Sequence, residues 1–295
     1  MTVALRYRRF SEGDWKFAVL SEEWTRELHD RVLDLVERQP PSKRPQTMEL
    51  PHADAKQGER LYLKVFHQAP GMANLKDLFR QSKALRSLRQ GEALSAAGFD
   101  VPTTIAAGEN RRFRILRRAF VLTRGIRGSP APVFLRDCSL SDGSPLPLAE
   151  KRNAIRRLAE QVARFHRLGF VHGDLVPSNI LVSMVEGAGL RLFFMDNDRT
   201  RRYPRWLPQS IWKRNLIQLN RLPLPGISLQ DRMRFFRSYF GDKDLGPVDL
   251  RFLRWLEVKT RQRRRECDSV DATGDFRKLM RWEDKTRNAA SYCSL

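Results

Sequence analysis

Two short acidic motifs, joined by what reads as a single hairpin, constrain this chain more than any other feature. The first is HGDLVPSN at residues 172–179, and the second is FMDND at residues 194–198. Residues 180–185 are apolar and strand-like, 186–189 have the composition of a turn, and 190–195 form a second strand-like run. We therefore predict a hairpin that returns the second motif to the side of the first.

The residue types in these motifs suit phosphoryl transfer. That reaction needs the acceptor oxygen, the phosphorus and the leaving oxygen roughly in line, with cations over the phosphates. Asp174 is of the type that accepts the proton of an attacking hydroxyl, while Asn179 and Asp196 carry the oxygen ligands that Mg²⁺ prefers. We expect His172 to hold the loop in shape. A solvated loop followed by unrelated acids is the alternative, and the combined pattern of HxDxxxxN, hairpin and DxD argues against it.

A predicted strand over residues 60–66 places one lysine between two aromatic residues. Leu61, Leu63 and Val65 alternate onto one face, which leaves Lys64 on the other. A strand lysine of this kind is typical of the one that binds ATP phosphates in kinases. The alternative is an edge-strand lysine that limits aggregation, and the downstream motifs favour the phosphate-binding interpretation.

Helical spacing and capping residues predict the main helices. We expect them over residues 21–39 with Ser21 as N-cap, from about Lys76 to Ala97 with Gly98 as C-cap, and over 148–168, 228–240 and 247–265.

The chain carries a formal net charge of +21, and its basic residues gather in blocks. The stretch from Arg199 to Gln230 contains no acidic residue. Such blocks attract a polyanion, whether nucleic acid, anionic lipid headgroups or a phosphorylated glycolipid, although any single block also fits a solvated basic face. The blocks comprise Arg111, Arg112, Arg114, Arg117 and Arg118; Lys259, Arg261, Arg263, Arg264 and Arg265; and Arg199, Arg201, Arg202, Arg205, Lys213, Arg214 and Arg221.

Three aromatic residues, Tyr203, Trp206 and Trp212, interleave with the basic residues of the last block. They suit either the core of a helical lobe or a platform for an anionic sugar or lipid headgroup, and the sequence leaves both open. The start of the chain lacks an apolar signal core, and no apolar run is long enough to span a membrane. We therefore expect a cytoplasmic protein.

Details of the motifs resemble one kinase family in particular. Gly173 and Val176 stand where protein kinases usually carry Arg and Lys, whereas HGD is usual among small-molecule kinases. The DNDR sequence at residues 196–199 resembles the DxDR of the lipopolysaccharide kinase (Kdo/WaaP) family, as do SKA at 82–84 and GFDVP at 98–102. The resemblance covers roughly residues 58 to 240.

This resemblance implies an α+β, two-lobed protein-kinase-like fold. The expected parts are a strand-rich nucleotide-binding lobe over residues 1–123, a hinge over 124–128 and a helical catalytic lobe over 129–295. The implied activity is ATP- and Mg²⁺-dependent phosphorylation of a heptose or Kdo hydroxyl in the lipopolysaccharide inner core. The implied location is the cytoplasmic side of the inner membrane, with an anionic glycolipid acceptor and an anionic membrane surface as partners.

By the same resemblance, Asp174 is the catalytic base, Asn179 and Asp196 are metal ligands, and Lys64 contacts ATP phosphates. The role of Asp198 stays open.

One departure concerns the partner of Lys64. Counted back from Gly98, the family's helix glutamate falls near Ser87, so either Glu92 substitutes for it or the partner is absent. Two alternative functions therefore remain: a kinase of another small molecule or of protein, and a non-catalytic pseudokinase that binds an anionic partner. A nucleic-acid binder is a weaker alternative, and the sequence does not predict the oligomeric state.

Overall fold

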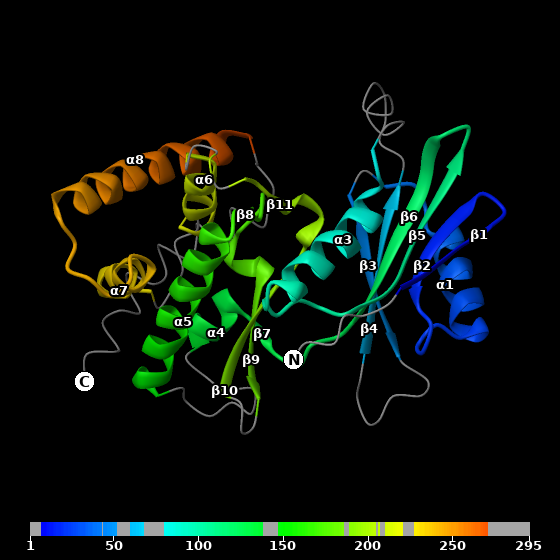
Figure 1. Cartoon of the computed structure of the whole chain (residues 1–295), viewed down its shortest axis with the longest axis horizontal. Coiled ribbons are helices and arrows are strands. Elements are labelled where there is room, and N and C mark those ends of the chain that lie inside the picture. The colour runs from blue at the N-terminus through cyan, green and yellow to red at the C-terminus, as the bar shows by residue number, and fades with distance from the viewer. Residues whose placement is uncertain are drawn as a thin grey trace. The chain divides into compact units, whose positions relative to one another are not determined.

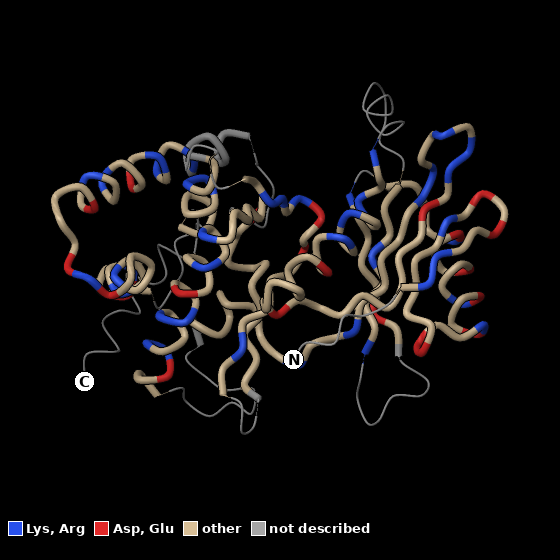
Figure 2. Tube along the Cα trace, in the orientation of Figure 1, with Lys and Arg blue, Asp and Glu red and all other residues tan. Residues whose placement is uncertain are grey.

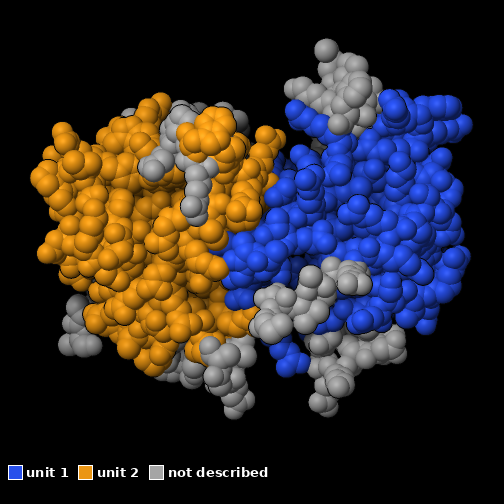
Figure 3. Space-filling model, viewed as in Figure 1, with its two compact units in different colours: residues 1–127, 193–199 blue, residues 128–192, 200–295 orange. Residues whose placement is uncertain are grey.

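The structure is a computed structural model of the 295-residue chain (Figure 1). It describes residues 7–42, 44–51, 60–67, 80–137, 147–185, 189–204, 206, 210–220 and 227–270. The chain divides into two compact units, coloured separately in Figure 3. Unit 1 comprises Met1–Arg127 and Phe193–Arg199, and unit 2 comprises Gly128–Leu192 and Thr200–Leu295. The sequence predicts one division, at residues 124–128. It does not predict that the chain returns to unit 1 at Phe193–Arg199.

Unit 1 is built on a six-stranded antiparallel sheet with the order β1-β2-β5-β6-β4-β3. Its strands are β1 (Tyr7–Glu12), β2 (Trp15–Leu20), β3 (Gln46–Pro51), β4 (Arg60–His67), β5 (Thr104–Arg112) and β6 (Ile115–Arg124). The predicted strand over residues 60–66 is confirmed as β4, and it lies between β3 and β6, inside the sheet. An edge-strand role for Lys64 is therefore wrong.

One helix covers each face of this sheet: α1 (Arg26–Arg38) and α3 (Lys83–Ala96) (Figure 1). The α1 face is packed with large apolar side chains, including Leu61, Leu63 and Val65 of β4. The α3 face carries small residues such as Ala107 and Ala119, together with larger ones. Lys64 alternates with Leu63 and Val65 of the α1-side core, so it lies on the α3 side of the sheet, as Phe66 does.

Both helices begin later than the sequence suggests. The N-cap of α1 is Thr25 rather than Ser21, because the chain first makes a turn after β2 and buries Trp24 in the core. The helix predicted from Lys76 starts at Lys83, where the Ser82 hydroxyl accepts a hydrogen bond from the Leu85 amide. Residues 68–79 lie outside the described part of the chain, while residues 80–82 are not helical. The cap side chain therefore sets the start of each helix.

Unit 2 is mainly helical. Its helices are α4 (Ala131–Asp137), α5 (Leu148–Arg167), α6 (Ser210–Leu219), α7 (Leu229–Tyr239) and α8 (Pro247–Val270). The predicted helices over 148–168, 228–240 and 247–265 are confirmed. Within unit 2, α7 packs on α5, and α8 packs on α6. No helix in the described ranges is both long and apolar enough to cross a lipid bilayer.

Short strands connect these helices. The predicted hairpin is confirmed as β9 (Ile180–Val185) and β10 (Gly189–Phe194), which are hydrogen-bonded neighbours in a three-stranded sheet with β7 (Ser129–Pro130). A separate pair joins β8 (Phe170–Val171) to β11 (Arg201–Arg202). The HGD motif follows β8 directly, so this pairing sets where the motif begins.

Candidate active site

The HGDLVPSN motif forms a compact loop in unit 2 that closes on the backbone of Asp174. The amide nitrogen of the Asn179 side chain donates to the carbonyl oxygen of Asp174 at 2.9 Å. The backbone amide of Val176 donates to the same oxygen, also at 2.9 Å. A 3-10 turn, η1 (Pro177–Asn179), then completes the loop. Since its nitrogen is used within the loop, Asn179 can offer its side-chain oxygen to a cation.

A glutamine from α6 holds the two residues on either side of Asp174. The Gln218 side-chain nitrogen donates to the Gly173 carbonyl oxygen at 3.0 Å, and its oxygen accepts from the Leu175 amide at 3.2 Å. Gly173 has a φ of 78°, in the left-handed region that glycine tolerates best. The sequence analysis missed Gln218, because its contacts to the loop span more than forty positions and no local pattern marks it.

The base of the loop is held by backbone contacts and burial. Gly169, which ends α5, has a φ of 84°, and its carbonyl oxygen accepts from the Tyr203 amide at 2.7 Å. A Cβ atom at Gly169 would lie 2.3 Å from the Tyr203 carbonyl oxygen, so only glycine fits. His172 is fully buried, with its ring centroid 6.3 Å from that of Phe165. This interior position suits the structural role expected for His172.

The second motif lies in unit 1, where Asp196 meets Lys64. The Lys64 ammonium nitrogen lies 2.6 Å from the Asp196 Oδ1 atom, and both side chains are partly exposed, at 24% and 36%. Asp196 has a φ of 53°, an uncommon backbone conformation for a residue other than glycine. The Lys64 nitrogen also lies 5.5 Å from the centre of the Phe66 ring. Lys64 and Asp196, both candidate site residues in the sequence analysis, are thus paired although they lie 132 positions apart.

The end of α3 holds this second motif in place. The Phe194 amide donates to the Asp100 carbonyl oxygen at 3.0 Å, and the Phe194 ring packs edge-on against Phe99 at 5.8 Å. The Asn197 side chain donates to the Phe194 carbonyl oxygen at 2.9 Å. A 3-10 turn, η2 (Asn197–Arg199), packs against α3. The GFDVP sequence that follows α3 thus anchors the segment that carries Asp196.

Asp198 is a buried carboxylate beside a second carboxylate. Burial raises the pKa of Asp198, and the nearby Asp196 raises it further, whereas Lys64 and Lys83 act in the opposite direction. Two close carboxylates repel one another, and a divalent cation relieves that repulsion. Oxygen atoms of this kind are the ligands that Mg²⁺ takes. The donor set of the second motif therefore fits a magnesium ion.

Glu92 faces a different part of unit 1 from Lys64. It lines a cavity of about 300 Å³ together with Arg9 and Lys16. Burial raises the pKa of Glu92, and Arg9 partly offsets this rise. Within the described residues, the ion pair made by Lys64 is with Asp196. The structure therefore does not place Glu92 as the helix partner of the lysine.

A different glutamate organises the start of α3. Glu109, on β5, accepts a hydrogen bond from the Ser82 amide at 3.1 Å and pairs with Arg111 at 2.9 Å. The side chains of Glu109 and Arg111 are only 8% and 13% exposed, so this ion pair is well shielded from water. A carboxylate at a helix N-terminus also complements the helix dipole. Sequence reasoning overlooked Glu109 because one acid on a strand carries no local signature.

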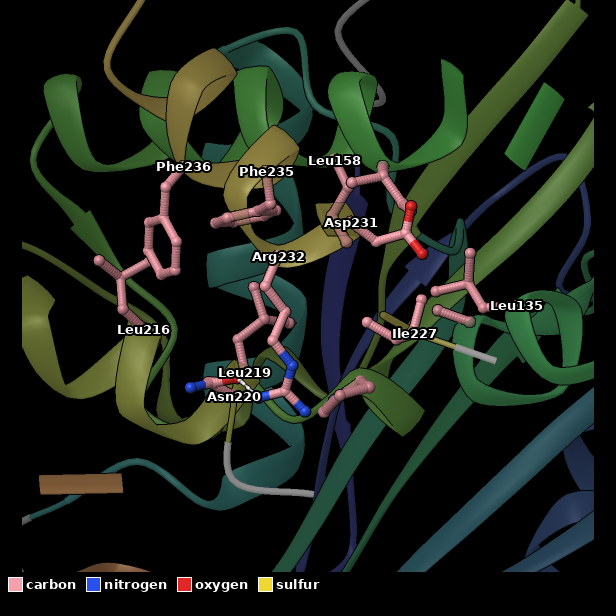
Figure 4. A pocket seen from close by; sticks show the side chains of 13 residues that line it. Leu135, Leu158, Leu216, Leu219, Asn220, Ile227, Asp231, Arg232, Phe235 and Phe236 are labelled. Carbon is pink, nitrogen blue, oxygen red and sulfur yellow. Dashed lines mark hydrogen bonds between the residues drawn. The ribbon is translucent and has the colours of Figure 1, made fainter. Parts of the chain in front are cut away.

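Beside the HGDLVPSN loop, unit 2 contains a largely apolar cavity of about 90 Å³ (Figure 4). Phe235 and Phe236 of α7 and Leu216 and Leu219 of α6 line it, together with Pro177 of the loop. Nucleotide phosphates need hydrogen-bond donors and cations around them. Asn220, Asp231 and Arg232 also line the cavity, but most of its walls are hydrocarbon, which makes this cavity a poor site for ATP.

The aromatic residues of the basic stretch separate into two roles. Trp212 is half-buried in an aromatic cluster of unit 2, where its ring lies 5.6 Å from that of His166, 6.1 Å from Tyr239 and 5.8 Å from Phe252. Trp206 is 81% exposed. The core interpretation therefore holds for Trp212. The side chains of Arg205, Arg221, Arg264 and Arg265, named in the basic blocks, lie outside the described part of the chain.

The four candidate residues thus form two pairs, each assembled within one unit: Lys64 with Asp196 in unit 1, and Asp174 with Asn179 in unit 2. In the described ranges, no cluster of three or more His, Cys, Asp or Glu side chains forms a self-sufficient metal site. Magnesium in kinases is held by few protein groups together with substrate phosphates. A magnesium site of the kinase type therefore needs few oxygen ligands from the protein.

The fold and these motifs define a kinase-like phosphotransferase. A family model described as "Lipopolysaccharide kinase (Kdo/WaaP) family" matches the chain over residues 52–239. Because the match covers more than half of the chain, the protein belongs to this family of lipopolysaccharide kinases, enzymes that phosphorylate a sugar hydroxyl. The family resemblance noted from the sequence is confirmed.

A solved structure supports the same fold. A chain described as WaaP in complex with acyl carrier protein aligns with a TM-score of 0.54 and 22% identity, covering 78% of this chain and 91% of that one. At this identity the likeness supports the α+β kinase-like fold and nothing finer. No curated protein matches the chain.

Proposed function

We propose that this protein transfers the γ-phosphoryl group of ATP to a heptose or Kdo hydroxyl of the lipopolysaccharide inner core. The observation that carries this proposal is the construction of the loop around Asp174. Its carbonyl oxygen accepts from Asn179, and Gln218 binds both neighbouring residues. A loop backbone held this firmly suits a residue that acts as a catalytic base, because a general base must lie within hydrogen-bond reach of the proton that it takes.

In this proposal, Asp174 accepts the proton of the attacking sugar hydroxyl. Lys64 binds the phosphates of ATP, and its present contact with Asp196 shows that the ammonium group is held on the α3 side of the sheet. Asn179 and Asp196 would hold Mg²⁺, which neutralises charge on the transferring phosphoryl group when it is bound. The 2.6 Å ion pair holds the Asp196 carboxylate beside the Lys64 ammonium group.

The charge of the chain supports an anionic acceptor. The net charge of +21 favours binding to lipid-linked core sugars that carry acidic groups and phosphates. We place the protein at the cytoplasmic face of the inner membrane, bound peripherally, where ATP and a lipid-linked acceptor are both accessible. The solved WaaP chain is in complex with acyl carrier protein, so an acyl carrier protein is the alternative partner.

The test is transfer of labelled γ-phosphate from ATP to purified lipopolysaccharide acceptors. One acceptor carries the inner-core heptoses, and a second ends at Kdo, so that the two sugars are distinguished. We expect Asp174→Asn to lower the rate about 1,000-fold, since general-base catalysis contributes about 100- to 10,000-fold. The same change at the exposed Asp244 is the matched control and should leave the rate unchanged. Mass spectrometry of the product then identifies the phosphorylated sugar.

Other outcomes separate the alternative functions. A wild-type protein that binds Mg-ATP but transfers phosphate only to a peptide or a soluble sugar would support a kinase of another substrate. If thermal unfolding shows no stabilisation by Mg-ATP and no acceptor is labelled, the pseudokinase hypothesis is favoured, because a ligand that binds the folded state raises its melting temperature. Full activity in Asp174→Asn would exclude the proposed role of this residue.

A further inference from the structure

One surface of unit 2 combines exposed apolar and basic side chains on the same helical face. On α8, Val248 is 69% exposed, Val258 is 63% exposed and Trp255 is 39% exposed. Arg251 and Arg254 lie between them and are also exposed. At 3.6 residues per turn, these five positions fall within an arc of about 120°. Such a face differs from an ordinary solvated helix surface, which is polar throughout.

Basic residues outnumber acidic residues on this helix. Lys and Arg recur along α8, as Figure 2 shows. Of the two acids in its described side chains, Asp249 pairs with Lys243 at 3.1 Å, and Glu257 pairs with Arg261 at 2.8 Å. Both acids are therefore already neutralised by neighbouring cations. The remaining charge on the exposed face is positive.

An apolar groove continues this face towards α7. Leu229, Met233 and Phe236 of α7 line one side, and Leu250 and Leu253 of α8 line the other. Its volume is about 670 Å³, and Arg232, Arg254 and Arg261 also line it. Leu229 is 75% exposed. The groove thus exposes hydrocarbon bordered by guanidinium groups.

The opposite face of α8 fixes the helix in position. Leu256 and Thr260 are buried against the rest of unit 2. At the border between the two faces, Lys213 of α6 lies 5.5 Å from the Phe252 ring centre and 5.3 Å from that of Trp255. The exposed apolar side chains therefore belong to a helix that is packed on its other side, and their exposure does not reflect a loosely attached element.

We propose that this surface docks the protein on an anionic lipid bilayer. We call it the α7–α8 surface and define it by the exposed side chains of Leu229, Val248, Arg251, Arg254, Val258 and Lys259. Apolar side chains insert at the boundary between headgroups and acyl chains, while arginine and lysine bind anionic headgroups. The inference rests on the proposed function in one respect, since a lipid-linked acceptor requires the enzyme to work at a membrane.

Other occupants fit this surface less well. A nucleic acid would bind the basic residues but would leave the exposed valines and leucine without apolar partners. A second copy of the chain, packed through the same surface, would place arginines against arginines, because a twofold contact is self-complementary. An anionic bilayer matches both the charge and the hydrocarbon.

The test is co-sedimentation of the purified protein with vesicles of phosphatidylethanolamine containing about one quarter phosphatidylglycerol, an anionic surface of the kind that attracts basic segments. Phosphatidylcholine vesicles serve as the neutral comparison. We expect Arg251→Glu/Arg254→Glu to weaken binding to anionic vesicles at least about 25-fold, because each basic residue near such a surface contributes about fivefold. We expect Val248→Ser/Val258→Ser to weaken it about tenfold through loss of apolar insertion.

The matched control is Arg112→Glu/Arg114→Glu, in the turn of the β5–β6 hairpin of unit 1, which changes the net charge by the same amount. If this control weakens binding as much as the α8 variant does, binding depends on overall charge and the assignment of the surface is wrong. Binding of wild type to an acyl carrier protein but not to vesicles would also overturn it.

Phosphorylation of a delipidated core oligosaccharide separates this inference from the proposed function. Surface variants that keep this activity and their melting temperature but lose vesicle binding support the docking surface. A wild type that phosphorylates lipopolysaccharide without binding vesicles disproves the surface and leaves the proposed function intact. A wild type that binds vesicles through this surface but phosphorylates no core sugar supports the surface and rejects the function.

Discussion

Replacing Gln218 with methionine tests whether α6 positions the catalytic loop. Methionine has a similar length and flexibility but cannot make the hydrogen bonds to the Gly173 carbonyl oxygen and the Leu175 amide, at 3.0 and 3.2 Å. Each lost hydrogen bond costs about 1 kcal/mol in a partly buried site. We therefore expect the free energy of unfolding to fall by about 2 kcal/mol.

The same change should affect catalysis through the position of Asp174, which lies between the two residues that Gln218 binds. A displacement of about 1 Å in a catalytic group can lower the rate about 100-fold. We expect kcat to fall by about 10- to 100-fold, with little change in the KM for ATP, because these hydrogen bonds of Gln218 hold the residues beside Asp174, whereas we assign the binding of ATP phosphates to Lys64. Gln218→Glu, which keeps an acceptor for Leu175 but loses the donor to Gly173, should fall between wild type and Gln218→Met.

The measurements are urea-induced unfolding and steady-state kinetics with a lipopolysaccharide acceptor. Gln230→Met, at an exposed position of α7, is the control and should behave like wild type. If Gln218→Met lowers stability but leaves kcat unchanged, the glutamine supports the fold without positioning the base. An unchanged free energy of unfolding would show that the two hydrogen bonds contribute nothing measurable, and our reasoning about this contact would be refuted.

Three further predictions follow from single contacts. Lys64→Met should raise the KM for ATP about 10- to 100-fold, the usual effect of losing a hydrogen bond to a charged group, while the partly exposed pair with Asp196 makes its effect on unfolding less than about 1 kcal/mol. Glu109→Gln should lower the free energy of unfolding by about 3 kcal/mol, because it removes the carboxylate that pairs with the shielded Arg111 at 2.9 Å. Burial lowers the pKa of His166 to about 3 in the folded state. The unfolded chain binds a proton on this residue below pH of about 6.5, so acidification should reduce stability by about 1.4 kcal/mol per pH unit until the folded pKa is reached.

Each of these predictions has a control and a contrary result. Glu49→Gln removes an exposed pair with Arg60 and should lower the free energy of unfolding by less than about 0.5 kcal/mol. If Glu49→Gln and Glu109→Gln lowered it equally, burial would not explain the expected cost at Glu109. His166→Gln should remove about 2 kcal/mol of the stability loss between pH 6.5 and 5, and an unchanged pH profile would exclude His166 as its source. A KM for ATP that stays at the wild-type value in Lys64→Met would remove this lysine from the nucleotide site.

Local sequence patterns predicted much of the secondary structure of this protein. The alternation along residues 60–66 placed Lys64 on the face opposite Leu61, Leu63 and Val65, and the hairpin over residues 180–195 was correct, because strand periodicity and turn composition act over a few residues. The helix starts at Ser21 and Lys76 were wrong for a tertiary reason. Core burial of Trp24 and the bond from the Ser82 amide to Glu109 decide where each helix can begin.

By itself, the sequence determined the family, the kinase-like motifs and most of the secondary structure, since each is written in neighbouring residues. Only the tertiary structure decided that Lys64 pairs with Asp196, that Glu92 lies with Arg9 instead, and that Gln218 holds the loop around Asp174. These contacts join positions far apart in the chain. They arise from the packing of whole helices against sheet and loop, for which no short stretch of sequence carries a signal.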